Sequence, residues 1–406
     1  MQSEMFEETR MEGATAQTRT LGLTIPLHKE SPVARAMRRI RTVMLKGMAP
    51  VVAYSSGKDS SALAALVLNA AREMRERGEH PMPVILVHAN TGVEQPEVTQ
   101  LALDELAKMK VYAKTHGLEV DVRVGHPTLS ASFPARVIGG RALPAFPDSR
   151  GDCSISWKQD VTAKLMDQAF KDLGCREDVK DIIVMTGVRQ DESIARAQKI
   201  KLRGEVAEGV WENDHGKLRA SPILDWTVED VWEFLGYCAA GMEPSFSDFG
   251  NVMRIYSASG GDSCVIVADM KMAGHQKACG SRHGCWACTR VAADKSMDNM
   301  IASDTQRYGY LKPLAALRNF MSNTQYDWSR RQFVGRTVDA DGNITIAADT
   351  YSPDMLADLL AYTLTAQIES GVQVISYQHL VAICSRWSLY GLHPPFTALK
   401  IYFEVL

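Results

Sequence analysis

The chain has 406 residues, of which 46% are hydrophobic and 23% charged, and its formal net charge is −3 at pH 7. At roughly 150 residues per domain this length predicts two or three domains, and the composition excludes a disordered, collagen-like or mainly coiled-coil chain. No apolar run approaches the ~18 residues that a membrane span needs. The acidic first ten residues lack the apolar stretch of a signal peptide. We therefore expect a cytoplasmic protein that makes no membrane contact.

Residues 1–45 are expected to form an N-terminal arm and a basic helix. Residues 1–30 show no clear periodicity, whereas residues 34–43 have a helix-like pattern that carries several arginines. Because the net charge is negative, any contact with a polyanion requires a local basic patch. The candidates for such polyanion contacts are Arg35, Arg38, Arg39, Arg41, Lys158, Arg330 and Arg331.

Strands and helices then alternate over residues 46–250. Short runs of aliphatic residues predict strands at 51–54, 83–88, 119–124 and 181–185. Periodic segments predict helices at 61–74 and 97–115. Strands separated by helices indicate an α/β fold with a doubly wound, mainly parallel sheet. We expect one domain over this range.

The rest of the chain divides into a cysteine-rich region, residues 251–330, and a small C-terminal extension, residues 331–406. The sequence at 227–230 resembles a capping box that begins a helix over 231–238. Residues 250–290 are rich in Gly, Ser and Cys, which predicts loops organised by a metal. A hairpin turn is expected at 339–343. Pro353 is expected to start a helix that runs to about residue 368.

The turn after the first predicted strand is the first candidate site, with the sequence Ser55-Ser-Gly-Lys-Asp-Ser60. The start of a helix after a buried strand presents backbone N–H groups that attract phosphate. Gly57 lets the backbone approach an anion, Lys58 adds positive charge, and Asp59 is expected to cap the helix or help to hold Mg²⁺. The spacing differs from that of a Walker A loop. The alternative is an ordinary capped turn.

The cysteines form the second candidate site. Disulfides are rare in a reducing cytosol, and Cys285-Trp-Ala-Cys288 is a CxxC pair preceded by Cys279 and Cys264. Four thiolates suit either Zn²⁺ or an iron–sulfur cluster, and the composition does not separate the two. A redox dithiol is a third possibility. Buried structural thiols are expected at Cys175, Cys238 and Cys384.

Three segments together resemble PP-loop ATP pyrophosphatases and phosphoadenosine phosphosulfate reductases. Ser55–Ser60 resembles the family loop SGGKDS, with Ser56 in place of Gly, and Asn90-Thr91-Gly92 resembles the family D-T-G with Asn in place of Asp. Residues 187–196 resemble the segment G-x-R-x-x-E-S-x-x-R. The resemblance implies catalytic roles for Lys58, Asp59 and Arg189. It implies nucleotide binding by Ser55, Ser56, Gly57, Lys58, Asp59, Ser60, Thr91, Gly92, Gly187, Arg189, Glu192 and Arg196.

Within that superfamily, residues 279–289 closely resemble the cysteine motif of the DNA sulfur-modification proteins called DndC and SspD. This resemblance implies ATP, Mg²⁺ and a [4Fe-4S] cluster as cofactors. It implies adenylation of a DNA backbone phosphate, followed by replacement of a non-bridging oxygen by sulfur. The implied partners are DNA, a cysteine desulfurase and other DNA sulfur-modification proteins. The implied cluster ligands are Cys153, Cys264, Cys285 and Cys288, with Cys279 as a competitor.

Three alternative functions remain. An adenylyl-sulfate or phosphoadenylyl-sulfate reductase uses a cysteine in a C-terminal E-C-G-[IL]-H motif, and the similar string 389–393 has Tyr390 where that thiol is needed. A tRNA thiolation enzyme is disfavoured by the strings at 189–196 and 279–289. A non-catalytic, zinc-stabilised DNA-binding module would show no ATP turnover.

Overall fold

The computed structural model describes residues 17–20, 23–26, 30–147, 152–192, 194–213, 216–260 and 284–406. Its centre is a six-stranded sheet in the order β5-β4-β3-β6-β8-β7, in which every neighbouring pair is parallel except β7 with β8. The strands are β3 Met48–Ala53, β4 Val84–Ala89, β5 Val120–Gly125, β6 Asp181–Met185, β7 Trp211–Glu212 and β8 Leu218–Ala220.

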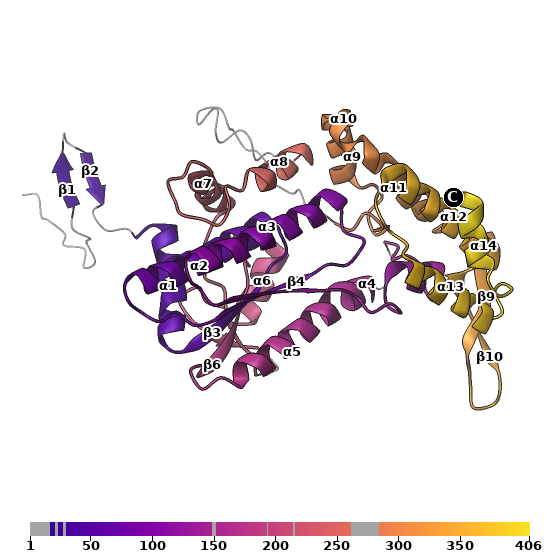
Figure 1. The fold of residues 1–406 in the computed structure, drawn as a ribbon, viewed down its shortest axis with the longest axis horizontal. Coiled ribbons are helices and arrows are strands. Elements are labelled where there is room, and N and C mark those ends of the chain that lie inside the picture. Colours follow the sequence, from indigo (N-terminus) through magenta and orange to yellow (C-terminus); the bar gives the residue numbers. More distant parts are fainter. Residues whose placement is uncertain are drawn as a thin grey trace, which may run out of the picture.

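Helices cover both faces of this sheet (Figure 1). On one face lie α1 Pro32–Leu45, α2 Lys58–Glu76, α3 Pro96–Thr115 and α7 Val228–Ala239, whose apolar residues share a core with β3, β4 and β6. On the other face, α5 Asp160–Gly174 packs on alternate residues of β3 and β4. The prediction of a doubly wound, mainly parallel α/β sheet is therefore confirmed.

The strand order indicates where a ligand crevice is expected. The chain runs from β3 outward to β4 and β5, then returns through α5 to β6 on the other side of β3. In open α/β sheets, ligands bind where the strand order reverses, outside the carboxyl ends of the strands. The turns that follow β3 and β6 meet at this position.

A second hydrophobic core lies beyond the sheet, on the right of Figure 1. It joins the segment after β5 to the cysteine-containing turn and to the C-terminal helices. The principal elements are α9 Lys295–Ser303, α11 Lys312–Asn323, α12 Pro353–Ser370, α13 Tyr377–Leu389 and α14 Thr397–Val405. The shorter elements nearby are η1 Pro134–Ile138, α4 Asp152–Ser154, η2 Ile155–Gln159, α10 Thr305–Tyr308, β9 Arg331–Val338 and β10 Ile344–Tyr351.

Local sequence signals are confirmed at several element boundaries. Thr227 and Asp230 form both hydrogen bonds of a capping box at the start of α7. Ser352 caps α12, which has Pro353 in its first turn. The strands β9 and β10 pair antiparallel around the turn at 339–343. Capping groups and turn residues act through neighbours in sequence, which is why they are readable without tertiary structure.

Three expectations need correction. The arm contains a paired strand ladder, β1 Gln17–Thr20 with β2 Leu23–Pro26. The loop-rich region begins with a helix, α8 Gly250–Ala258, whose apolar residues face the core. Cys175 is exposed at the end of α5, although Cys238 is buried. Among the described residues, no helix combines the length and apolar character needed to cross a bilayer.

Candidate functional site

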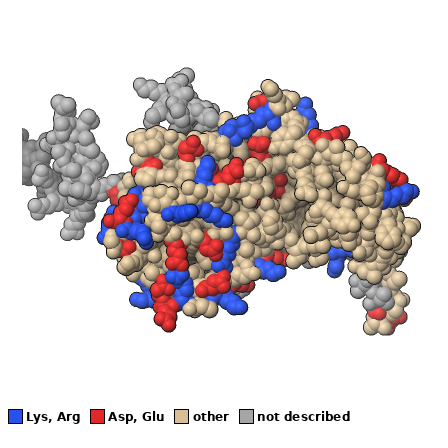
Figure 2. Space-filling model, in the orientation of Figure 1, with Lys and Arg blue, Asp and Glu red and all other residues tan. Residues whose placement is uncertain are grey.

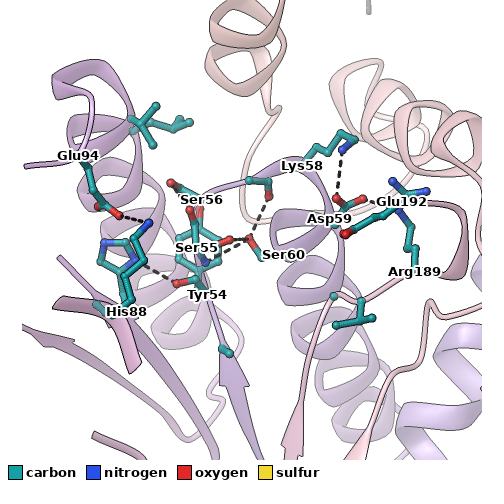
Figure 3. Close-up of a pocket in the computed structure, with 18 of the residues that line it drawn as sticks. Tyr54, Ser55, Ser56, Lys58, Asp59, Ser60, His88, Glu94, Arg189 and Glu192 are labelled. Carbon is teal, nitrogen blue, oxygen red and sulfur yellow. Dashed lines mark hydrogen bonds and ion pairs between the residues drawn. The ribbon is translucent and has the colours of Figure 1, made fainter. Parts of the chain in front are cut away.

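A cavity of about 560 Å³ opens at the carboxyl ends of β3, β4 and β6 (Figure 3). Its wall contains the whole loop 54–60, residues 187–189, and side chains from α5 and α8. The loop 54–60 follows β3 and leads directly into α2. The predicted phosphate loop and the predicted arginine segment, which are about 130 residues apart in sequence, therefore face one cavity.

Serine hydroxyls fix the shape of the loop. The Ser60 Oγ donates to the Gly57 carbonyl at 3.0 Å, and the Ser55 N–H donates to Ser60 Oγ at 3.2 Å. Gly57 is the N-cap of α2 and supplies no side-chain cap. Ser56 has a φ of 57°, in the left-handed region that favours glycine. The loop is thus held from inside, and the first turn of α2 faces the cavity.

Asp59 binds both cations of the site. Its Oδ2 lies 3.1 Å from Lys58 Nζ, and its Oδ1 accepts a hydrogen bond of 2.6 Å from Arg189 Nε (Figure 3). The Arg189 side chain is 3% exposed. Its Nη1 is buried without a hydrogen-bond acceptor among the described residues, and lies 3.6 Å from Asp191 Oδ2. A buried guanidinium with an unused donor suits a phosphate oxygen.

Gly187 allows the two segments to meet. A Cβ at this position would lie 2.8 Å from the Asp59 carbonyl oxygen and 3.1 Å from the Ser60 nitrogen. Only glycine leaves room for the turn after β6 to pass the start of α2 at this distance. Gly187 therefore has a structural reason to be glycine, and its role in nucleotide binding stays a prediction.

Other predicted nucleotide-binding residues take different positions. Glu192 lines the cavity, whereas Thr91 and Gly92 are not among its lining residues. Thr91 and Gly92 instead form the turn after β4, in which the Gly92 N–H donates to Asn90 Oδ1 at 2.9 Å. Arg196 lies on α6 Ile194–Leu202, and its side chain is outside the described part of the chain.

Three predicted cluster ligands line a second cavity of about 700 Å³, namely Cys153, Cys285 and Cys288. Lys158 and Gly284 belong to the walls of both cavities. The CxxC turn is held against the loop after β4, because Glu94 pairs with Cys285 as an antiparallel bridge. The thiols and the phosphate loop are thus neighbours in the folded chain.

Burial and neighbouring charges shift the pKa values of the cysteine thiols and of Lys158 beside them. Burial raises the pKa of Cys285 to about 11, against the opposing effect of Lys158. Burial and the neighbouring Cys288 raise the pKa of Cys153. Burial acts to lower the pKa of Lys158, but Cys285 and Glu94 outweigh it and raise that pKa. Lys158 Nζ lies 3.2 Å from Glu94 Oε1.

The donor chemistry fits a thiolate-bound centre, since soft sulfur ligands suit zinc or an iron–sulfur cluster. Within the described ranges, no group of three candidate ligands is close enough to hold a metal ion. The predicted ligand Cys264 and its competitor Cys279 lie outside the described residues. The described cysteines therefore supply only part of the ligand set that was predicted.

The arginines predicted to contact DNA mostly bind carboxylates of the chain itself. Arg38 contacts Glu30 and Glu208, and Arg41 pairs with Glu79. Arg39 and Arg331 are buried, so the prediction of a surface contact is wrong for these two. Basic and acidic residues also intermingle on the face shown in Figure 2 and form no continuous basic patch there.

Sequence reasoning missed Tyr256 and His88, which both line the first cavity. The Tyr256 hydroxyl accepts a 3.3 Å hydrogen bond from the backbone N–H of Lys58. His88 Nδ1 lies 3.0 Å from the Tyr54 carbonyl. Since that carbonyl only accepts, Nδ1 carries the proton. Tyr256 lies in a region that the sequence predicted to be loops. The one signal for His88 was that it is a polar residue in an otherwise apolar strand.

Comparisons with known proteins show similarity over part of the chain. Residues 157–244 match the family model described as the phosphoadenosine phosphosulfate reductase domain. Sulfate adenylyltransferase subunit 2 of Mycolicibacterium gilvum is 26% identical over 225 residues, which are 52% of this chain and 61% of that protein. The same subunit of Mycobacterium tuberculosis is 25% identical over 219 residues, 50% of this chain and 59% of that protein. The chain thus matches less than two thirds of these relatives.

Two solved structures show weaker similarity. A phosphoadenylyl-sulfate reductase from Candida auris, in a phosphate complex, has 13% identity and a TM-score of 0.29, covering 52% of this chain and 81% of that one. The U34-tRNA thiolase NcsA from Methanococcus maripaludis, with its [4Fe-4S] cluster, has 14% identity and a TM-score of 0.31. The similarity covers 51% of this chain and 64% of that one. At these scores neither likeness carries an argument about function.

Proposed function

We propose that the chain is an ATP pyrophosphatase that adenylates a backbone phosphate of DNA, so that sulfur can replace a non-bridging oxygen. The observation that carries the ATP part is the meeting of Arg189, Lys58 and the first turn of α2 at one cavity. The match to the phosphoadenosine phosphosulfate reductase domain and the relatives named sulfate adenylyltransferase subunit 2 support chemistry on sulfur and adenylate. The DNA part rests on the resemblance of residues 279–289.

In this proposal the triphosphate lies over the loop 54–60. Phosphate oxygens take over the contacts that Asp59 makes with Lys58 and Arg189, because an anion of higher charge competes for both cations. Mg²⁺ would neutralise charge on the departing pyrophosphate, and Asp59 and Glu192 are the nearby carboxylates suited to hold it.

The chemical step is an adenylyl transfer. A non-bridging oxygen of the DNA phosphodiester attacks the α-phosphorus of ATP, and the bond to the β-phosphate breaks as pyrophosphate leaves. A sulfur anion, delivered by a cysteine desulfurase and other DNA sulfur-modification proteins, then attacks the DNA phosphorus, and AMP leaves. Because a phosphodiester oxygen is a weak nucleophile, the protein acts by positioning and by stabilising charge through Lys58 and Arg189.

The thiol cavity belongs to the same proposal. Lys158 and Gly284 line both cavities, which supports the proposal that sulfur ligands act next to the nucleotide. A [4Fe-4S] cluster bound there would supply a binding site for sulfur. Cys153, Cys285 and Cys288 line this cavity and would be its ligands in the proposal, although they do not form a closed ligand group in the described structure.

Pyrophosphate release tests the ATP part. Lys58→Ala is expected to lower the rate of pyrophosphate release from ATP by at least about a hundredfold, because a charge-assisted contact to phosphate is lost. The control is Lys110→Ala, which removes an exposed lysine on α3. Both variants should keep the circular dichroism spectrum of the wild type. Undiminished release by Lys58→Ala would refute the loop assignment.

Mass spectrometry of DNA tests the substrate. DNA from cells with the intact system should contain sulfur-bearing dinucleotides, and Cys285→Ser should remove them because one thiol of the second cavity is lost. Cys175→Ser, at an exposed cysteine, is the matched control. If the dinucleotides persist in the Cys285→Ser cells, an essential thiol centre is ruled out.

A reductase is the second candidate function, favoured by the family match at 157–244. Tyr390 stands where that mechanism needs a cysteine, at the end of α13. The string 389–393 therefore supplies no attacking thiol for the sulfate sulfur. Release of sulfite from adenylyl sulfate by the purified protein, supplied with a dithiol as the two-electron reductant, would favour the reductase over the DNA enzyme.

A further inference from the structure

Tyr256 contacts the phosphate loop from a distant part of the chain. It lies on α8, 198 residues after Lys58, and its hydroxyl accepts the Lys58 N–H at 3.3 Å. The Lys58 ammonium lies 5.6 Å from the centroid of the Tyr256 ring. The same hydroxyl would be 3.4 Å from a Cβ placed on Gly57. One phenol therefore contacts both the backbone N–H and the ammonium of Lys58, the first residue of α2.

The hydrophobic core, and not the loop, fixes this phenol. The Tyr256 ring packs edge-on against Trp232 of α7, with centroids 5.3 Å apart and an interplanar angle of 80°. Val252 and Ile255 anchor α8 in the same core. An aromatic pair held in a core keeps its geometry when the solvent or ligand beside it changes. The hydroxyl is thus a preformed part of the cavity wall.

The contact between Tyr256 and the Lys58 N–H involves a kind of group that commonly binds phosphate. Backbone N–H groups at a helix start and a lysine ammonium are the usual donors to phosphate oxygens. At this position a tyrosine hydroxyl now accepts from one of them. A hydroxyl accepts and donates, so it can keep the N–H bond and give its own proton to a phosphate oxygen. A phenylalanine would have the same shape but neither bond.

We propose that Tyr256 is a phosphate-binding residue of the loop, which holds the Lys58 N–H and donates its hydroxyl proton to a phosphate oxygen of the bound nucleotide. This inference rests on the proposed nucleotide site. The buried, partly unused guanidinium of Arg189 on the same cavity is the independent sign that an anion binds there. Tyr256 thereby makes α8 part of the nucleotide site.

The test is Tyr256→Phe, which keeps the ring, its contact with Trp232 and its position beside Lys58. Isothermal titration should show Kd values for ATP and for pyrophosphate about tenfold higher than wild type, since a charge-assisted hydrogen bond is lost. The Kd for adenosine should be unchanged. In turnover assays, the KM for ATP should rise about tenfold while kcat changes less than threefold. Tyr237→Phe, at an exposed tyrosine of α7 bonded to Glu233, is the control and should match wild type.

Other results would overturn the inference. Wild-type affinity of Tyr256→Phe for ATP and pyrophosphate would show that the hydroxyl makes no phosphate contact. Equal losses for adenosine and pyrophosphate would assign Tyr256 a packing role alone. If wild type binds ATP but releases no pyrophosphate in the presence of DNA, and Tyr256→Phe weakens ATP binding, the proposed function fails and the inference stands. If wild type binds none of the three ligands, both fail.

Discussion

Ser56 adopts a backbone conformation that suits glycine, with a φ of 57° in the middle of the phosphate loop. The left-handed region costs a residue with a Cβ about 1–2 kcal/mol. Such strain persists where surrounding structure fixes the backbone, and it concentrates at functional sites. Here the hydrogen bonds between Ser55, Ser60 and Gly57 fix it. Ser56, which stands where the similar loop SGGKDS has glycine, therefore adds stored strain as well as a side chain.

Ser56→Gly is expected to raise the free energy of unfolding by about 0.5–1 kcal/mol, because relief of strain exceeds the added flexibility of the unfolded chain. Urea unfolding with an unchanged m-value measures this gain. Ser61→Gly, at the fourth residue of α2, is the matched control and should lose about 0.5 kcal/mol. Equal losses in the two variants would show that the loop stores no strain at Ser56.

At the scale of elements, ion pairs attach the helix α1 to the rest of the molecule. Arg39 donates to Glu208 at 2.6 Å and to Asp225 at 2.6 Å, and also to the Pro222 carbonyl at 2.8 Å. The basic residues of this helix, which indicated a DNA contact by composition, are used within the molecule. Hydrogen bonds from Arg39 and Arg38 lower the pKa of Glu208 to about 2.

This network predicts a pH dependence. Because the folded-state pKa of Glu208 lies below its unfolded value, its contribution to stability is complete above about pH 5. The contribution is lost as the pH falls through about 2. Urea unfolding of wild type and Glu208→Gln should therefore differ at pH 6 and converge toward pH 2. A difference that is independent of pH would mean that the Glu208 charge does not stabilise α1.

At the scale of the whole molecule, the C-terminal extension is part of the second core. Trp387 of α13 is fully buried, and its Nε1 donates to the Ile138 carbonyl at 2.8 Å. Ile138 is the last residue of η1, which follows β5 in the chain. The extension is therefore hydrogen-bonded to a segment about 250 residues earlier. The same core includes Trp286, which sits inside the CxxC pair. The extension thus packs in the same core as the CxxC turn that lines the thiol cavity.

Trp387→Ala is expected to lower the free energy of unfolding by about 3–5 kcal/mol, since a large buried side chain and a buried hydrogen bond are lost. The control is Trp328→Ala, because Trp328 is 59% exposed and should change stability by less than about 0.5 kcal/mol. Chemical unfolding followed by circular dichroism measures both. Similar values for the two variants would show that the extension is not packed on the rest of the chain.

The sequence by itself determined the features that depend on near neighbours. The strand, loop and helix around Ser55–Ser60, the capping box of α7 and the cap of α12 are local, because hydrogen bonds over a few residues define them. The parallel sheet also followed, since strands separated by helices leave few other arrangements. The prediction of which residues bind the nucleotide came from a resemblance, and the structure places most of its described members on one cavity.

Only the tertiary structure decided which distant groups meet. It brought Tyr256 to the Lys58 N–H, set Lys158 between the two cavities, and turned Arg39 inward onto Glu208 and Asp225. No local pattern encodes these contacts, because each depends on how the helices pack on the sheet and on the second core. A charged or aromatic residue has the same appearance in sequence whether it faces water, a carboxylate or a ligand. Packing makes that choice.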